Sequence, residues 1–291
     1  MAEETGRTRF HYGFYSAMKV EYDLRSAAVT YEQEKQLGED PVRLDFLIIK
    51  KNLTVSLDDP IGQFFNRVNL FEYKSPEDGM SVDDFYKAQG YGLIYKGFDR
   101  KVNELPIEDI TLTLVRHSYP RDMIKALKLS GFIINEPHEG IYRFDGKISI
   151  PVQLVVTSRL PDGEYDGLKL LASGCTKETV LSYAEKAIAS GDENIKANAG
   201  TVISICLDIN RELGTELKEA GLMNEVIRDI FKKDFEVAEM KGKQDGINDA
   251  NERVATDMLR DGKPIDEIKK YSKLAEDAIR NLAKTLGVAV L

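Results

Sequence analysis

The sequence contains only two cysteines, no tryptophan and three histidines among 291 residues. Cys175 and Cys206 form no Cys-x-x-Cys pair, which excludes a zinc ribbon and a disulfide framework and is typical of a reducing compartment. The three histidines lie far apart in the sequence, without the spacing of metal ligands. We therefore assign no chemical role to either residue type.

Long apolar runs are also missing. No stretch approaches the about 18 apolar residues of a transmembrane helix, and the acidic start Met-Ala-Glu-Glu has neither the basic nor the apolar region of a signal peptide. We expect a cytoplasmic protein that does not bind a membrane.

Usable glycine-rich motifs are absent as well. The segment from Gly140 to Gly146-Lys147 has one residue too many for a P-loop and lacks the following Ser or Thr. Gly90-x-Gly92 lacks the third glycine of a dinucleotide fingerprint. We expect no use of nucleoside triphosphates and no dinucleotide cofactor.

Basic residues are outnumbered by acidic ones. With 40 Lys and Arg against 49 Asp and Glu, the formal charge is −9, so the molecule as a whole would repel a phosphate backbone. Any nucleic-acid function must therefore depend on a local site. The 42% of apolar residues excludes a disordered or collagen-like chain and provides for a substantial core.

The periodicity of apolar residues predicts an α/β fold with a mixed β-sheet core flanked by helices, and a helical C-terminal half. We divide the chain into an α/β core over 1–158, a helical extension over 159–234 and a helical tail over 235–291. The elements expected in the core are a helix over 10–25, strands over 43–51, 67–74 and 110–116, helices over 81–96 and 120–130, and a hairpin of 140–144 with 147–157.

Charged residues occur at apolar positions of the first two expected strands. Asp45 lies within the first, where a charge is costly unless it is paired or binds a metal. Glu72 and Lys74 alternate with Phe71 in the second and so point to one face. If the strands are neighbours, these side chains converge, and Glu21 on the inward stripe of the first helix can join them. Carboxylate oxygens suit Mg²⁺ or Mn²⁺, and a lysine beside them can orient an attacking water or help to deprotonate it.

This arrangement resembles a known nuclease motif. Asp45 followed by Glu72-Tyr73-Lys74 is similar to the PD-(D/E)xK pattern, and the strings Phe71–Pro76 and Asp83–Lys87 resemble the PD-(D/E)xK family transposases, also called recombination-promoting nucleases. The tail from Gly242 to Leu282 is similar to the tail of those proteins. The resemblance implies a restriction-endonuclease-like fold and Mg²⁺-dependent hydrolysis of DNA phosphodiester bonds, with transposition, recombination or defence against foreign DNA as the candidate settings.

Carried over residue by residue, the resemblance makes Asp45, Glu72 and Lys74 the catalytic residues and Asp45, Glu72 and Glu21 the metal ligands. Leu44 stands where the name of the motif has proline. Gln89 is followed at +4 by Leu93 rather than by the tyrosine of a related helix motif, which leaves Lys87 and Gln89 as candidate DNA contacts.

Other interpretations remain open at this point. Asp45, Glu72 and Lys74 could form a buried salt bridge, and the fold could be a degenerate nuclease that acts as a DNA-binding or assembly module. A metal-dependent hydrolase of RNA or of nucleotides could use the same site.

The tail carries an apolar stripe at helical spacing, with Ile247, Val254 and Met258 among its members. The pattern breaks at Gly262 and Pro264, after which two short helices are expected that would suit a small helix-turn-helix. We expect the tail to make assembly contacts in a homo-oligomer such as a dimer, which would gather the basic residues of two chains around one groove on DNA.

Overall fold

The computed structural model of the chain describes residues 2–25, 29–33, 36–37, 42–43, 46–52, 57–97, 101–219, 230 and 232–288. The chain forms two compact units, Met1–Ile230 and Phe231–Leu291.

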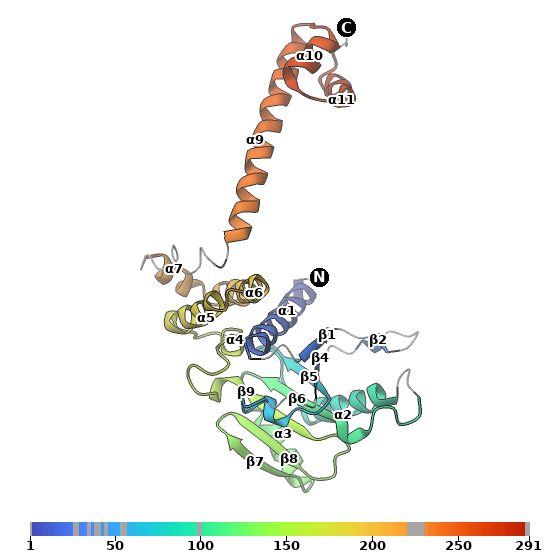
Figure 1. Cartoon of the computed structure of the whole chain (residues 1–291), viewed down its shortest axis with the longest axis vertical. Coiled ribbons are helices and arrows are strands. Elements are labelled where there is room, and N and C mark those ends of the chain that lie inside the picture. Colours follow the sequence, from blue (N-terminus) through green and yellow to red (C-terminus); the bar gives the residue numbers. More distant parts are fainter. Residues whose placement is uncertain are drawn as a thin grey trace. The chain divides into compact units, whose positions relative to one another are not determined.

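A seven-stranded mixed sheet is the centre of the first unit, with strand order β1-β4-β5-β6-β9-β8-β7 (Figure 1). The strands β5, β6 and β9 are parallel to one another, and the remaining neighbours are antiparallel. The seven strands are β1 (Val29–Gln33), β4 (Phe46–Lys51), β5 (Val68–Lys74), β6 (Ile110–Arg116), β7 (Ile133–His138), β8 (Ile141–Asp145) and β9 (Val152–Val156). A separate two-stranded ladder pairs β2 (Gln36–Leu37) with β3 (Val42–Arg43).

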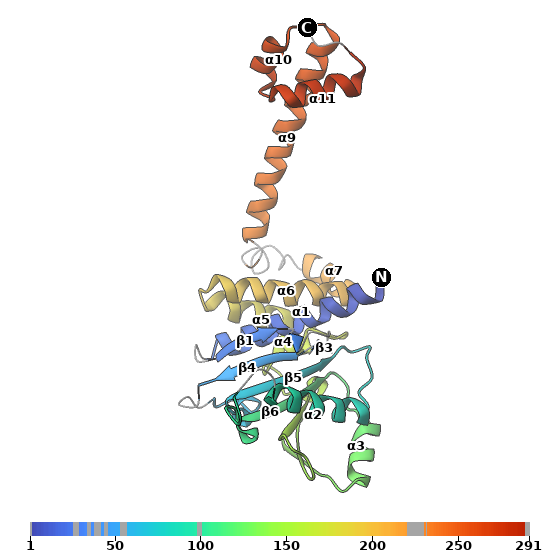
Figure 2. The same cartoon turned by 90° about the vertical axis from the view of Figure 1, so that its right-hand side faces the viewer.

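Helices cover both faces of this sheet, as Figure 2 shows. On one face lie α1 (Ala2–Asp23), α4 (Asp166–Lys169), α5 (Lys177–Ala189) and α6 (Glu193–Ile209), followed by α7 (Arg211–Glu219). On the other face lie α2 (Val82–Gly97) and α3 (Arg121–Leu129). Short 3₁₀ helices occur in the described connections at η1 (Gly62–Phe64), η2 (Ile107–Asp109) and η3 (Thr157–Arg159).

Strand β5 is buried on both faces. Val68 and Leu70 belong to the apolar core shared with α2 and α3. Phe71 and Tyr73 point the other way, where the ring of Phe14 on α1 lies 6.2 Å and 4.6 Å from theirs, centroid to centroid. Since side chains alternate along a strand, Glu72 and Lys74 lie on the α2 face.

The second unit consists of α9 (Lys232–Arg260), α10 (Ile265–Ser272) and α11 (Glu276–Leu286). Its own apolar core consists of Ala255, Leu259, Ile268, Ile279 and Ala283. Lys273 adopts a left-handed conformation with φ of 61° and ends α10, which allows the chain to turn into α11. The helix, turn and helix expected in the tail are therefore present.

The expected α/β class is confirmed in its coarse form, a mixed sheet flanked by helices. The strand expected over 67–74, the helix over 81–96, the strand over 110–116 and the helix over 120–130 correspond to β5, α2, β6 and α3. The segment 43–51 is divided between β3 and β4, and residues 44–45 lie outside the described residues. The helices α4 to α7, which fall within the helical extension expected over 159–234, belong to the same compact unit as the sheet.

Two strands of the seven-stranded sheet, β1 and β7, have no counterpart in the sequence prediction. Both are edge strands of the sheet, and the sequences Val-Thr-Tyr-Glu-Gln and Ile-Ile-Asn-Glu-Pro-His are rich in polar residues. An edge strand buries less apolar surface than a central one, so its apolar signal is weak. Within the described residues, no helix is both long and apolar enough to cross a membrane.

Candidate functional site

Glu72 and Lys74 lie together at the carboxyl end of β5. The Lys74 Nζ is 3.3 Å from the Glu72 Oε1, and the two side chains are only 9% and 12% exposed. Because they are two residues apart on a strand, both point to the face covered by α2. The structure therefore brings these two predicted residues together.

A third charged residue, Asp84 in the first turn of α2, completes this cluster. The Asp84 Oδ1 lies 3.1 Å from the Lys74 Nζ. The Oδ2 accepts hydrogen bonds from the backbone N–H and the hydroxyl of Ser81, both at 2.8 Å. The Ser-x-x-Asp pattern thus forms a capping box that fixes one oxygen and leaves the other for Lys74. We refer to Glu72, Lys74 and Asp84 as the lysine cluster.

Within the lysine cluster, the opposite charges of Lys74 and the two carboxylates favour the ionised form of each other. Burial alone would lower the pKa of Lys74, but the carboxylates of Glu72 and Asp84 more than offset this effect, so the pKa is raised above its usual value. Burial raises the pKa of Asp84, whereas the hydrogen bonds from Ser81 and the ammonium of Lys74 lower it, and the net direction is downward. Lys74 is therefore an ammonium and Asp84 a carboxylate at neutral pH.

Asp45, the third predicted catalytic residue, lies outside the described residues. The residue directly after it, Phe46, is paired with Glu72 in the antiparallel ladder of β4 and β5. The condition that the two strands are neighbours is therefore met by β4 and β5.

Glu21 is not brought to the lysine cluster. It lies near the C-terminal end of α1, where Arg25 Nε donates to its Oε1 at 2.9 Å. Tyr22, the next residue, packs its ring 5.3 Å from that of Phe65, which precedes β5. Helix α1 covers the opposite face of the sheet, so Glu21 lies beside the beginning of β5 while Lys74 lies at its end. We therefore leave Glu21 out of the proposed metal ligands.

The two predicted DNA contacts on α2 have different surroundings. Lys87 is exposed, with its Nζ 5.3 Å from the centre of the Tyr91 ring. Gln89 is buried, and its amide donates to the Ile150 carbonyl at 2.8 Å and accepts from the Ile150 N–H at 3.2 Å. The Gln89 amide thus joins α2 to the segment before β9 and does not face a ligand at the surface. The structure therefore gives Gln89 a role in packing, which corrects the expectation that it contacts DNA.

A second polar cluster lies near the amino end of β5 and was missed from the sequence. Asp59 is 5% exposed, and its Oδ1 accepts from the Gly62 N–H at 2.8 Å, the Tyr165 hydroxyl at 2.6 Å and the Tyr22 hydroxyl at 3.3 Å. The Tyr165 hydroxyl also accepts from the Ile61 N–H at 3.1 Å. Burial and then Asp59 raise the pKa of Tyr165, so its hydroxyl remains a donor. We refer to Asp59, Tyr22 and Tyr165 as the tyrosine cluster.

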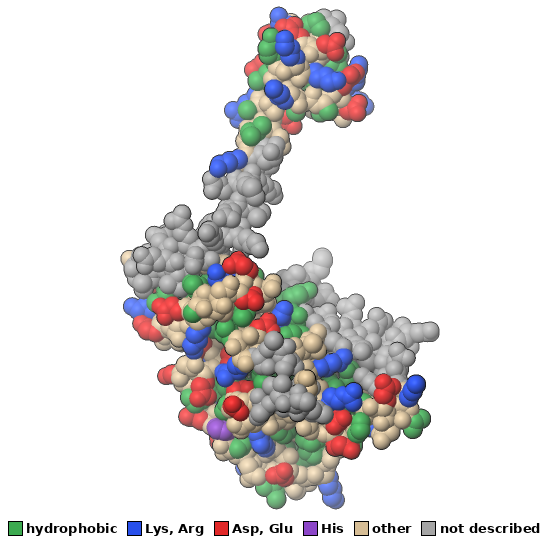
Figure 3. All heavy atoms as spheres, viewed as in Figure 1, with side chains coloured by type: hydrophobic (Ala, Val, Ile, Leu, Met, Phe, Trp, Pro, Cys, Tyr) green, Lys and Arg blue, Asp and Glu red, His purple; other side chains and the backbone are tan. Residues whose placement is uncertain are grey.

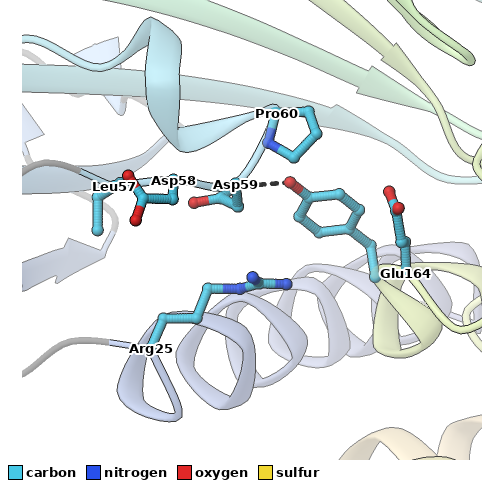
Figure 4. A pocket seen from close by; sticks show the side chains of 7 residues that line it. Arg25, Leu57, Asp58, Asp59, Pro60 and Glu164 are labelled. Atoms are coloured by element: carbon cyan, nitrogen blue, oxygen red, sulfur yellow. Dashed lines mark hydrogen bonds between the residues drawn. The ribbon is translucent and has the colours of Figure 1, made fainter.

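A pocket of about 410 Å³ opens beside the tyrosine cluster (Figure 4). Arg25, in the turn after α1, lies across it from Asp58 and Asp59, and its guanidinium carbon is 5.5 Å from the centre of the Tyr165 ring. Within the described residues, no group of three or more His, Cys, Asp or Glu side chains is arranged to hold a metal ion. The pocket therefore gives no sign of a metal centre among those residues.

Some of these features left a signal in the sequence. The motif Asp58-Asp59-Pro60-x-Gly62 is typical of a turn in which an aspartate accepts a backbone N–H. The pattern Ser81-x-x-Asp84 is typical of a helix start, but it gives no sign of the contact with Lys74, because that contact depends on how α2 packs on β5.

Charge is mixed over the surface seen in Figure 3, where Lys and Arg side chains are interleaved with Asp and Glu. Comparison of the chain with family models, with curated proteins and with solved structures found no match.

Proposed function

We propose that this chain is a metal-dependent DNA endonuclease that hydrolyses phosphodiester bonds at the lysine cluster. The observation that carries the proposal is the pair Glu72 and Lys74, held 3.3 Å apart at the end of β5, with Phe46 in register beside Glu72. The PD-(D/E)xK resemblance implies a glutamate and a lysine on one face of a strand, beside the strand that follows the aspartate. Glu72 and Lys74 share such a face, and Phe46, the residue after Asp45, is paired with Glu72. The mixed sheet with helices on both faces supports the restriction-endonuclease-like interpretation.

The donors present suit a hard cation. Glu72 offers a carboxylate at the edge of the buried region, and Asp45 would add another from the segment that leads into β4. Oxygen ligands of this kind are those that Mg²⁺ and Mn²⁺ prefer. Bound there, the ion would polarise a phosphoryl oxygen and lower the pKa of water. We assign Asp45 and Glu72 as its protein ligands.

Lys74 would act as an ammonium. Its raised pKa follows from the carboxylates of Glu72 and Asp84, so the group carries its proton at neutral pH. An ammonium can donate a hydrogen bond to a water or to a phosphate oxygen, and it stabilises negative charge that develops in the transition state. Of the two roles predicted for Lys74, orienting the water is therefore favoured over deprotonating it.

The structure also gives an observation in favour of a catalytically degenerate module. Lys74 forms ion pairs with two carboxylates of the chain itself, and such a triad can simply stabilise the junction of β5 and α2. In that case the fold would act by binding DNA or by assembly. A hydrolase of RNA or nucleotides is the other alternative, because the same groups act on any phosphodiester.

Nicking of supercoiled plasmid by the full chain, with Mg²⁺, with Mn²⁺ and with chelator, tests the proposal. We expect cleavage only with metal, and its loss in Asp45→Ala and in Lys74→Ala. Calorimetry should separate the two variants, because Asp45→Ala removes a ligand whereas Lys74→Ala keeps the ligands. Full activity of either folded variant contradicts the assignment, and cleavage of RNA but not of DNA supports the alternative substrate.

We propose that the second unit makes contacts between copies of the chain. It has its own small apolar core, and Ile247 and Val254 of α9 remain 54% and 40% exposed. A chain that ends at residue 230 should therefore retain metal-dependent cleavage but form particles with fewer copies of the chain than the full-length protein does, as light scattering measures after division by the mass of each chain. An unchanged number of copies together with lost cleavage would show instead that the second unit completes the active site.

A further inference from the structure

The carboxyl ends of three parallel strands, β5, β6 and β9, meet at one edge of the sheet. In the register of these strands, Lys74 is paired with Arg116, and Arg116 is paired with Val156. Residues paired in this way point to the same face. Arg116 therefore lies on the same face as Lys74, one strand further along the edge.

Arg116 differs from Lys74 in its partners. Lys74 contacts two carboxylates, whereas Arg116 makes no ion pair within the described residues. The Arg116 Nε is buried and has no hydrogen-bond partner in the part of the chain that the structure describes. A buried N–H of a charged group that lacks an acceptor is costly. Arg116 as a whole is only partly buried, so an anion from outside the chain can approach its guanidinium and offset the charge.

A second arginine lies along the same edge. The loops after β6 and β9 are joined because the Ser158 N–H donates to the His117 carbonyl at 3.1 Å and the His117 Nδ1 lies 3.2 Å from the Thr157 Oγ1. These contacts place Arg159, the last residue of η3, next to the residues that follow Arg116.

The guanidinium of Arg159 is held by aromatic residues and remains exposed. Its carbon lies 4.3 Å from the centre of the Tyr119 ring, and it donates a hydrogen bond to the Tyr142 hydroxyl. Glu136, which accepts from the Gly140 N–H, is near enough to offset part of this charge. Because tyrosine is neutral, these two aromatic contacts orient the guanidinium without neutralising it.

We infer that this edge binds the phosphate backbone of duplex DNA through Arg116 and Arg159, along a path that leads to Lys74 and Glu72. The inference rests on the proposed function, since a polynucleotide substrate carries phosphates on both sides of the one that is cleaved. The planar fork of an arginine matches two phosphate oxygens. Phosphate contacts carry no sequence information, so binding at this edge should not depend on base sequence.

The test measures binding apart from cleavage. Fluorescence anisotropy of a labelled duplex of mixed sequence, titrated with the full chain in chelator over a range of salt concentrations, compares wild type with Arg116→Gln and Arg159→Gln. Lys128→Gln, which removes an exposed charge from the last turn of α3, is the matched control. Arg116→Lys tests the same position while it keeps the charge, and thermal melting checks the fold of every variant.

We expect each arginine variant to weaken duplex binding about 5- to 10-fold and to reduce the salt slope by about 1, with the control within about twofold of wild type. Arg116→Lys should bind better than Arg116→Gln. Unchanged affinity and slope in folded variants, or no binding of DNA by wild type, overturns the inference. A lower melting temperature for Arg116→Gln with an unchanged salt slope also overturns it, because Arg116 would then serve only the fold.

The plasmid assay distinguishes this inference from the proposed function. If nicking depends on metal but duplex binding does not depend on Arg116 or Arg159, only the inference about these two arginines is overturned. Arginine-dependent binding without nicking overturns the proposed activity alone and supports the degenerate module. Stronger binding to the single strand of the same sequence than to the duplex contradicts our assignment of duplex DNA.

Discussion

The two ends of β5 stabilise buried carboxylates in opposite ways. At the carboxyl end, Glu72 and Asp84 share the ammonium of Lys74, so the cluster is held by charge. At the amino end, Asp59 is held by two tyrosine hydroxyls and a backbone N–H. The carboxylates of the lysine cluster are thus paired with an ammonium, whereas Asp59 of the tyrosine cluster accepts hydrogen bonds from neutral donors.

This difference indicates where chemistry can occur. The ion pairs of the lysine cluster can exchange a partner for a metal or a phosphate, because both are charged groups of the kind already present. The hydrogen bonds of the tyrosine cluster link α1, α4 and the loop before β5, and removing one leaves a buried group unsatisfied. We therefore expect the lysine cluster to affect activity and the tyrosine cluster to affect stability.

The largest expected effect is on catalysis. Glu72→Gln should lower the rate of plasmid nicking by at least about 10²-fold, because it removes a charge that acts on the ion and on Lys74. Its melting temperature should fall, because Lys74 loses one of its two carboxylate partners, so nicking is compared at a temperature where both chains are folded. Glu185→Gln, at an exposed position of α5, is the control and should cleave as wild type does. A folded Glu72→Gln chain with wild-type activity would remove the distinction between the two clusters.

The next effect is on stability. Tyr165→Phe removes a hydroxyl that bridges the Ile61 N–H and Asp59, so it should lower the free energy of unfolding by about 1–3 kcal/mol. Urea unfolding measures this change, with Tyr12→Phe at an exposed site of α1 as the control. Nicking at a temperature where the variant is folded should stay near the wild-type rate. Lost nicking in a stable variant would place chemistry at the tyrosine cluster.

The smallest effect concerns pH. The pKa of Asp84 is lowered in the folded chain, so its contribution to stability is complete above the ordinary Asp pKa of about 3.9 and is lost as the pH falls through the lowered value. Asp84→Asn should therefore be less stable than wild type at neutral pH, by up to about 1 kcal/mol. The two melting temperatures should converge in acid. A difference that grows toward low pH would contradict this linkage.

The central elements of the fold could be predicted because they bury apolar residues at regular spacing. The strand over 110–116 matches β6, whose first six residues are all buried. The edge strands β1 and β7 could not, since an edge gains stability from backbone pairing more than from an apolar face. The periodicity after residue 158 indicates helices but not that α4 to α7 share a compact unit with the sheet, because periodicity shows that a helix has a buried face but not which neighbour covers it.

The candidate site was predictable where it depends on local geometry. Glu72 and Lys74 share a face because they are two residues apart on a strand. Glu21 was misplaced because its stripe on α1 gives no information on which face of the sheet the helix covers. Gln89 and Asp84 show the same limit, since the contacts of Gln89 with Ile150 and of Asp84 with Lys74 join elements that are distant in sequence.

Metal binding by variants of the two clusters tests the central claim most directly. Calorimetric titration of Mn²⁺ into the full chain should show binding by wild type, the same binding by folded Asp59→Asn, and greatly weakened binding by Glu72→Gln. Binding that survives Glu72→Gln and is lost in folded Asp59→Asn would contradict the account, because it would place the metal at the tyrosine cluster instead of the lysine cluster.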